Sequence, residues 1–170
     1  MTTPTLKFLS GELAPAGELA AGVEAARTAG ELWALSWTPS ALLAEAKAAR
    51  VLLAVEERRD GDKEVGFVLL RAPGALWEIT LMYVAPEARG TGVFDGLIAA
   101  AKRVALLCDV AEVGGPDSQR VGLEVRADNR RARNAYERVG FHEVSRRKAY
   151  YQDGCDAILL ETRLSTGGGP

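Results

Sequence analysis

The sequence predicts a single domain of the α/β (α+β) class, with a mixed, mostly antiparallel sheet flanked by about four helices. A chain of 170 residues that is 48% apolar and 26% charged is long enough to bury one substantial core. β-Favouring runs separated by turns such as Asp60-Gly61 are typical of antiparallel hairpins, and other segments carry apolar residues at helical spacing. With no internal repeat or linker, we expect one domain over residues 1–164 and a disordered tail over 165–170.

The first part of the chain predicts one short strand and two helices. The strand lies around residues 6–8, and an Ala-rich helix interrupted by glycines follows over 15–35. Thr38-Pro39 then provides the N-cap and the first-turn proline of a second, short helix.

Three strands should follow. We expect them at residues 51–55, 65–70 and 76–84, separated by turns at 56–63 and 72–74.

The third of these strands leads into a glycine-containing loop and a helix. Pro86 cannot donate to a sheet, so the strand ends before it, and Arg89-Gly90-Thr91-Gly92 connects it to a helix over 93–107. Glycines allow close approach of a ligand, and a helix N-terminus favours negative charge, so this stretch suits a pyrophosphate. It matches neither the Rossmann fingerprint, which needs glycine where Asp95 stands, nor the nucleotide P-loop. A plain strand-to-helix turn is the alternative interpretation.

The remaining chain predicts a strand, a helix and a closing pair of strands. An irregular segment over 112–120 precedes a strand over 121–125. Asp128-Asn129 caps a helix that reaches Val139, and Gly140 ends it in the left-handed region. We expect the antiparallel pair at residues 141–151 and 157–164, joined near 153–154.

One face of the predicted 129–139 helix combines groups suited to ligand binding. Asn129, Ala132 and Tyr136 lie at helical intervals, which places an amide, a small side chain and a phenol on the same side. A packed helix with a core tyrosine would give the same pattern.

Composition excludes several function classes. A net charge of −2 is too balanced for a general polyanion binder, so we expect no nucleic-acid partner. Cys108, Cys155 and His142 form neither a disulfide framework nor a zinc pattern, and we expect no metal. The sequence shows no signal-peptide pattern and no 18-residue apolar run, so we expect a cytoplasmic protein without membrane contact.

Two spaced motifs give the sequence a resemblance to the GNAT superfamily of acetyl-coenzyme A (acetyl-CoA)-dependent N-acetyltransferases. They are Val84-x-Pro86-x-x-Arg89-Gly90-x-Gly92-Val93 and Asn129-x-x-Ala132-x-x-Ala135-Tyr136-x-x-x-Gly140-Phe141. Further segments resemble the bacterial branch that acetylates the N-terminal alanine of a ribosomal protein: Leu123-Glu124-Val125-Arg126-Ala127, Arg147-x-x-Tyr150-Tyr151, Asp153-Gly154-x-Asp156-Ala157 and Trp37-Thr38.

The resemblance implies acetyl-CoA as co-substrate and a set of site residues. It implies cofactor binding by Met82, Tyr83, Val84, Arg89, Gly90, Thr91, Gly92, Val93, Phe94, Asp95, Asn129 and Tyr136, with a splayed strand at Met82–Val84. It implies Glu124 as general base, Glu78 as the base position of other branches, and Tyr136 as general acid or sulfur-positioning group. Tyr150, Tyr151 and Trp37 would line the acceptor side, although strand aromatics and core packing explain them equally.

Two residues depart from the family pattern. Phe94 stands where a small residue is usual, in the first turn of the helix beside the expected phosphates, and should crowd the pocket. Glu87 places a negative charge near an anion.

The resulting hypothesis is acetyl transfer to a primary amine, with the N-terminal α-amine of a protein as the leading acceptor. An α-amine has a pKa of about 7.7–8.0, so a weak base is sufficient, whereas lysine at about 10.4 would need a stronger one. The alternatives are a small-molecule amine acetyltransferase and a non-catalytic acyl-CoA sensor. We expect a monomer or a homodimer.

Overall fold

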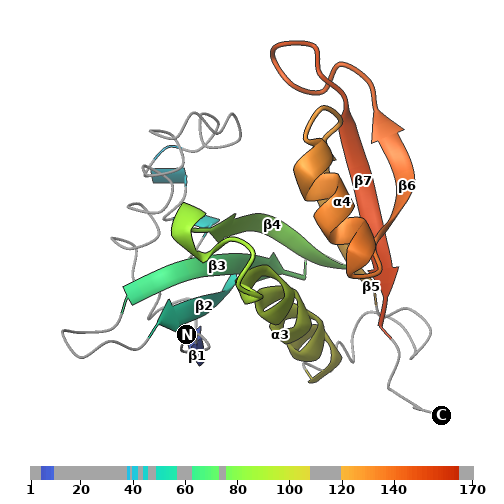
Figure 1. Ribbon diagram of the computed structural model, residues 1–170. Coiled ribbons are helices and arrows are strands. Elements are labelled where there is room, and N and C mark those ends of the chain that lie inside the picture. The colour runs from blue at the N-terminus through green and yellow to red at the C-terminus, as the bar shows by residue number, and fades with distance from the viewer. Residues whose placement is uncertain are drawn as a thin grey trace. The chain divides into compact units, whose positions relative to one another are not determined.

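The computed structural model describes residues 5–9, 38, 40–41, 44–45, 49–56, 63–72, 76–107 and 120–164. These residues belong to two compact units (Figure 1). The first unit comprises Met1–Arg71 and Leu81–Ala101, and the second comprises Ala72–Thr80 and Lys102–Pro170.

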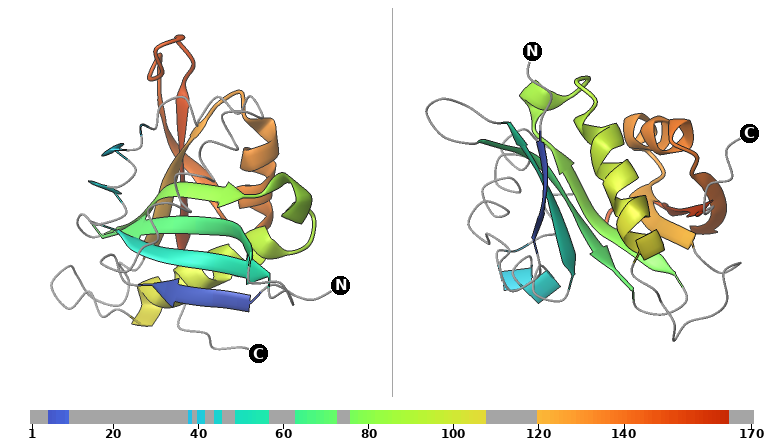
Figure 2. Two further views of the ribbon diagram at one scale, coloured as in Figure 1. Left: turned by 90° about the vertical axis from the view of Figure 1, so that its left-hand side faces the viewer. Right: turned by 90° about the horizontal axis from the view of Figure 1, so that it is seen from below.

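The first unit is built on antiparallel strands. β1 (Thr5–Leu9) pairs with β2 (Arg50–Glu56), and β2 pairs with β3 (Lys63–Arg71), so that the three strands lie side by side (Figure 2). The second half of β4 (Trp77–Val84), the 3₁₀ turn η3 (Pro86–Ala88) and most of α3 (Val93–Leu107) complete the unit.

Helix α3 packs closely on β3 at a glycine. A Cβ atom at Gly66 would lie 2.8 Å from the main-chain oxygen of Tyr83 and 3.1 Å from a methyl group of Val93. The missing side chain therefore lets β4 and the first turn of α3 approach β3. This contact fixes the strand end and the helix start that flank the Arg89–Gly92 loop.

The described residues of the second unit form a mixed sheet, one complete helix and the end of α3. The first half of β4 runs parallel to β5 (Arg120–Arg126), and β7 (Ala157–Arg163) pairs antiparallel with both β5 and β6 (His142–Arg147). Helix α4 (Arg130–Arg138) lies beside β7 in Figure 1. The α/β class with a mixed, mostly antiparallel sheet is thus confirmed.

Strand β5 separates a buried face from a polar face. Val121, Leu123 and Val125 are buried, whereas Glu124 and Arg126 alternate with them and are partly exposed. Because successive side chains of a strand point to opposite sides, the two charged residues share the second face.

Helix caps and a left-handed terminus occur where the sequence predicts them. The side chain of Asn129 accepts a hydrogen bond of 3.1 Å from the N–H of Ala132, and Thr38 accepts one of 3.1 Å from the N–H of Ala41. Gly140 has φ of 92°. The predicted 15–35 helix, most of the irregular 112–120 segment, the 165–170 tail and Cys108 lie outside the described residues.

The predicted strand over 141–151 is wrong at its end, over residues 148–151. β6 ends at Arg147, and Ala149 adopts φ of 48°, a left-handed conformation that a strand does not allow. The carboxylate of Asp156 accepts a hydrogen bond of 2.9 Å from the N–H of Ala149 and stabilises the turn. Tyr150 and Tyr151 therefore lie on a turn and not on a strand.

The short η3 turn was not predicted, because its three residues are too few to show a helical period. No helix within the described ranges combines the length and the apolar content needed to cross a bilayer.

Candidate active site

The Arg89–Gly92 loop of the first unit, predicted as an anion cradle, turns at two glycines with left-handed backbone conformation. Gly90 and Gly92 have φ of 80° and 90°, a region that other residues rarely adopt. Two contacts brace the loop: Thr91 Oγ1 donates a 2.6 Å hydrogen bond to the Ala88 oxygen, and Arg89 Nε donates a 3.0 Å bond to the Val84 oxygen.

The start of α3 directs main-chain donors out of the helix. Gly96 N donates to the Gly92 oxygen at 2.9 Å, and this bond begins the helical series. The N–H groups of Val93, Phe94 and Asp95 precede that series and point away from the helix body. A Cβ on Gly90 or Gly92 would meet no atom within 4 Å, so the space beside the loop is open to a ligand.

The structure pairs the negative charge of Glu87 with a lysine. Lys63 Nζ, at the start of β3, and Glu87 Oε1, in η3, are 2.5 Å apart, and both side chains are partly exposed. Glu87 therefore presents less negative potential to an anion than its position in the sequence suggests. Phe94, the other departure from the family pattern, is half-buried in the first turn of α3.

The end of β4 carries the three residues expected along the pantetheine arm. Tyr83 is buried and packs on Phe67 with ring centroids 5.6 Å apart, whereas Met82 and Val84 are half-buried on the opposite side of the strand. Within the described residues, the paired positions of β4 and β5 run from Trp77–Val121 to Ile79–Leu123, and β4 then continues to Val84.

In the second unit, Tyr136 lies buried on α4. Its side chain is only 7% exposed and packs edge-to-face on Phe141, with ring centroids 5.5 Å apart. Burial raises the pKa of the phenol above its ordinary value, so the hydroxyl is protonated at neutral pH. The Asn129 side-chain oxygen is used in the helix cap, so a ligand contact from this side chain would use its amide nitrogen.

Lys102 contacts this aromatic pair, a role that the sequence analysis did not predict. Its ammonium group donates a 2.6 Å hydrogen bond to the Val139 oxygen and lies 5.3 Å from the centroid of the Phe141 ring. Desolvation lowers the pKa of this lysine. A lysine on a helix normally indicates an exposed surface, so no local signal distinguishes this one.

The two candidate bases lie on the same face of the sheet. Glu78 is opposite Gly122 in the parallel register of β4 and β5, and Glu124 is two residues further along β5. Side chains two apart in a strand share a face, so the carboxylates of Glu78 on β4 and Glu124 on β5 lie on the same face of the sheet. The side chain of Glu124 is 23% exposed and accepts an ion-pair contact of 2.6 Å from Arg147 Nη1.

Glu124 is linked through Arg147 to the two tyrosines of the turn. The Arg147 guanidinium lies 5.5 Å from the centroid of the Tyr150 ring, and the two tyrosine rings meet edge-to-face at 5.2 Å. Tyr150 is 50% exposed. Burial raises the pKa of Tyr151, and the charge of Glu124 raises it further. Trp37 lies outside the described residues.

Comparison with protein families now identifies the class. Residues 47–143 match the family model described as an acetyltransferase (GNAT) domain, which is more than half of the chain. The chain therefore belongs to the GNAT acetyltransferase family, and it is an acyltransferase.

Solved structures show the same fold. Nourseothricin acetyltransferase is 28% identical, with a TM-score of 0.56, over 69% of this chain and 66% of its own. The ribosomal-protein-S18-alanine N-acetyltransferase from Escherichia coli is 21% identical, with a TM-score of 0.71, over 97% and 96%. The NatC complex bound to Gag peptide and CoA is 19% identical, with a TM-score of 0.71, over 96% and 100%. A comparison with curated proteins gave no significant match.

Proposed function

We propose that this acyltransferase uses acetyl-CoA to acetylate a primary amine, with the N-terminal α-amine of a protein as its acceptor. The observation that carries the proposal is the cluster of Glu124 with Arg147, Tyr150 and Tyr151 on the polar face of the second unit. A partly exposed carboxylate suits an incoming amine, and aromatic rings on a turn suit the side of an extended peptide. The fold of the Escherichia coli ribosomal-protein-S18-alanine N-acetyltransferase is consistent with this acceptor class.

The cradle of the first unit fits the pyrophosphate of acetyl-CoA. Its positive-φ glycines leave open space, and the first N–H groups of α3 offer hydrogen bonds to phosphate oxygens. We assign the Arg89–Asp95 segment to the pyrophosphate, the main chain of Met82–Val84 to the pantetheine arm, and Asn129 and Tyr136 to the thioester end. When bound, acetyl-CoA supplies the activated acetyl group.

Glu124 is the preferred base in this proposal. Its Oε1 atom would take the proton of the acceptor ammonium, directly or through a water molecule. Arg147 already contacts this carboxylate, so a positively charged acceptor would compete with the guanidinium for the same oxygen. Glu78 lies on the same face and is the second candidate base.

Tyr136 is proposed to donate from its hydroxyl to the departing sulfur. Its raised pKa keeps the proton on the phenol, which is the state needed for a donor. Since a thiol has a pKa of about 8.5, complete proton transfer from this phenol would be uphill. We therefore assign Tyr136 to hydrogen-bond stabilisation of the developing thiolate first, and to proton delivery second.

A small-molecule amine is the second candidate acceptor. The 28% identity with nourseothricin acetyltransferase, the highest of the three compared structures, favours it. This alternative keeps Glu124 and Tyr136 in their roles but gives none to Tyr150.

The test is a steady-state assay of free thiol release from acetyl-CoA against two acceptor panels. One panel holds short peptides with free N-terminal Ala, Ser, Met or Gly, and the other holds amino acids, polyamines and aminoglycosides. Turnover on peptides that disappears when their N-terminus is blocked supports the proposal, and turnover on small amines alone replaces it with the second candidate. Silence on both panels with intact acetyl-CoA binding would indicate a sensor.

Glutamine substitutions distinguish the two candidate bases. Glu124→Gln should lower kcat by about 10²-fold or more, while Glu78→Gln serves as the matched carboxamide control. The reverse ranking would transfer the role of base to Glu78.

A further inference from the structure

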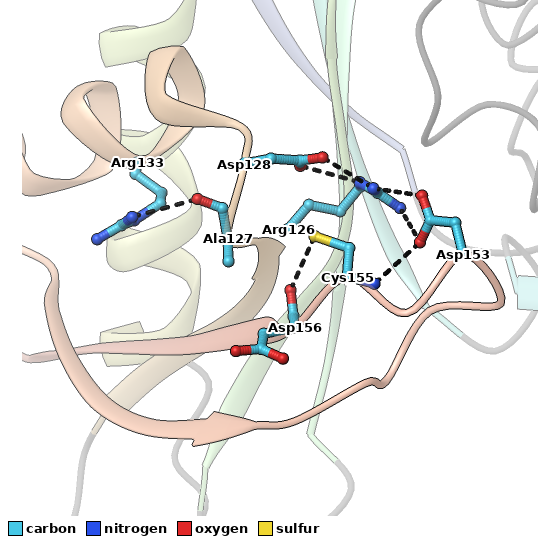
Figure 3. A network of polar contacts seen from close by, with 7 residues as sticks. All are labelled: Arg126, Ala127, Asp128, Arg133, Asp153, Cys155 and Asp156. Atoms are coloured by element: carbon cyan, nitrogen blue, oxygen red, sulfur yellow. Dashed lines mark hydrogen bonds and ion pairs between the residues drawn. The ribbon is translucent and has the colours of Figure 1, made fainter.

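A guanidinium at the end of β5 joins two loops of the second unit. Arg126 Nε and Nη2 contact the two carboxylate oxygens of Asp128 at 3.1 and 2.9 Å, and Nη1 and Nη2 contact those of Asp153 at 3.3 and 2.7 Å (Figure 3). Asp128 precedes the N-cap of α4, and Asp153 lies in the turn that carries the tyrosines. One side chain therefore holds both segments to the strand that carries Glu124.

The burial of the three side chains is uneven. Arg126 is 11% exposed, whereas Asp128 and Asp153 are 54% and 56% exposed. The guanidinium favours the charged form of both carboxyl groups and holds the pKa of each below its usual range. Planar, two-point pairs of this kind fix orientation as well as distance.

The segment held by Asp153, residues 148–156, is also closed by its own main chain; we call it the tyrosine turn. Tyr151 N donates to the Cys155 oxygen at 3.0 Å, and Gly154 N donates to the Tyr151 oxygen at 2.8 Å. Asp153 Oδ1 accepts a further bond of 3.1 Å from Cys155 N. Asp153 thus connects the closed turn to Arg126.

Arg126 also contacts the aromatic side of the turn. Its guanidinium carbon lies 4.7 Å from the centroid of the Tyr151 ring, which in turn packs on Tyr150. Tyr150 contacts Arg147, the partner of Glu124. A continuous series of contacts therefore runs from Arg126 through the tyrosine turn to the candidate base.

We propose that Arg126 is a positioning residue that determines acceptor specificity by holding the tyrosine turn beside Glu124. This inference rests on the proposed function, because it assumes that the acceptor chain lies along Tyr150 and Tyr151. An acceptor with several residues would contact the turn, whereas a free amine would reach only the carboxylate. The anchored turn therefore favours peptides over small amines.

Two matched substitutions test the proposal. Asp153→Asn removes the ion pair that anchors the turn but keeps an oxygen that can accept from Cys155 N. Asp128→Asn removes the other carboxylate charge that pairs with this guanidinium. Its side chain is similarly exposed, but it lies on the α4 side. We expect Asp153→Asn to raise the KM for a peptide with an N-terminal alanine about tenfold, because the loss of one charge-assisted hydrogen bond costs about that much in affinity. The KM for acetyl-CoA should stay unchanged. Asp128→Asn should leave the peptide KM unchanged.

Hydrogen exchange of the full-length protein provides a readout that is independent of activity. The amides of Tyr151, Gly154 and Cys155 should exchange faster in Asp153→Asn than in Asp128→Asn. Equal exchange in the two variants would overturn the anchor, and faster exchange with an unchanged peptide KM would overturn its role in acceptor specificity. If the unmodified protein acetylates no peptide, both the proposed function and this specificity fail, and the exchange data still decide whether Asp153 anchors the turn.

Discussion

Replacing Tyr136 by phenylalanine separates the chemistry of this residue from its packing. The ring, only 7% exposed, would keep its edge-to-face contact with Phe141, worth about 0.5–1.5 kcal/mol. Only the hydroxyl is lost, so the free energy of unfolding should fall by no more than about 1–2 kcal/mol. Tyr136→Ala, by contrast, would empty the site and should cost about 3–5 kcal/mol.

The effect on turnover should be much larger than the effect on stability. A positioned hydrogen-bond donor to developing negative charge contributes about 10²–10³-fold, so kcat in the thiol-release assay should fall by at least about 100-fold, equivalent to about 2.7 kcal/mol. Calorimetry should show acetyl-CoA affinity within about threefold of the unmodified protein, because a single neutral hydrogen bond is worth little net free energy.

A second tyrosine provides the control. Tyr151→Phe also removes a phenol whose pKa burial raises, but it lies on the tyrosine turn and should keep kcat within about threefold. Unchanged kcat in Tyr136→Phe would refute the assignment of Tyr136 as donor. A parallel loss of acetyl-CoA affinity and kcat would show that the hydroxyl acts in binding alone.

Two further predictions follow from backbone strain and from charge. Gly92→Ala should lose about 1–2 kcal/mol of stability through strain at φ of 90°, and it should raise the KM for acetyl-CoA. The control Gly154→Ala, at φ of 80° and with equally open space, should lose similar stability but leave that KM unchanged. Equal KM values for acetyl-CoA in the two variants would refute the cradle. The pKa values of Asp128 and Asp153 are lower in the folded protein than in the unfolded chain, so their stabilisation is present above about pH 4 and is lost as the pH falls through the folded values. The temperature midpoint of thermal unfolding should therefore fall as the pH is lowered below about 4, and it should fall less steeply in Arg126→Met. Identical dependence of the midpoint on pH in the two proteins would contradict this.

The sequence predicted most of the described elements because their signals are local. Apolar runs and the turn residues between them placed β2 and β3, and helical periodicity after Gly92 placed α3 within the bounds that the structure gives. The Asn129 cap and Gly140 terminus of α4 are likewise properties of a few consecutive residues. The candidate site residues were also chosen from sequence, through their resemblance to the family motifs.

The end of β6 shows where local signals fail. The run from Phe141 to Tyr151 contains residues that favour strands, yet the strand ends at Arg147. The deciding contacts come from Asp156, which bonds to Ala149, and from Asp153, which pairs with Arg126. β-Propensity is a weak preference, and tertiary contacts outweigh it.

The sequence by itself therefore determined the fold class, and its family motifs proposed the residues of a phosphate-binding loop and of an acetyl-transfer site. Only the tertiary structure decided how their charges are balanced: Lys63 pairs with Glu87, and Arg147 pairs with Glu124. It alone revealed that Arg126 anchors the tyrosine turn. These partners lie 24 residues apart for Lys63 and Glu87, and 27 for Arg126 and Asp153. No periodicity or spacing rule spans such distances, since the folding of the strands brings those charges together.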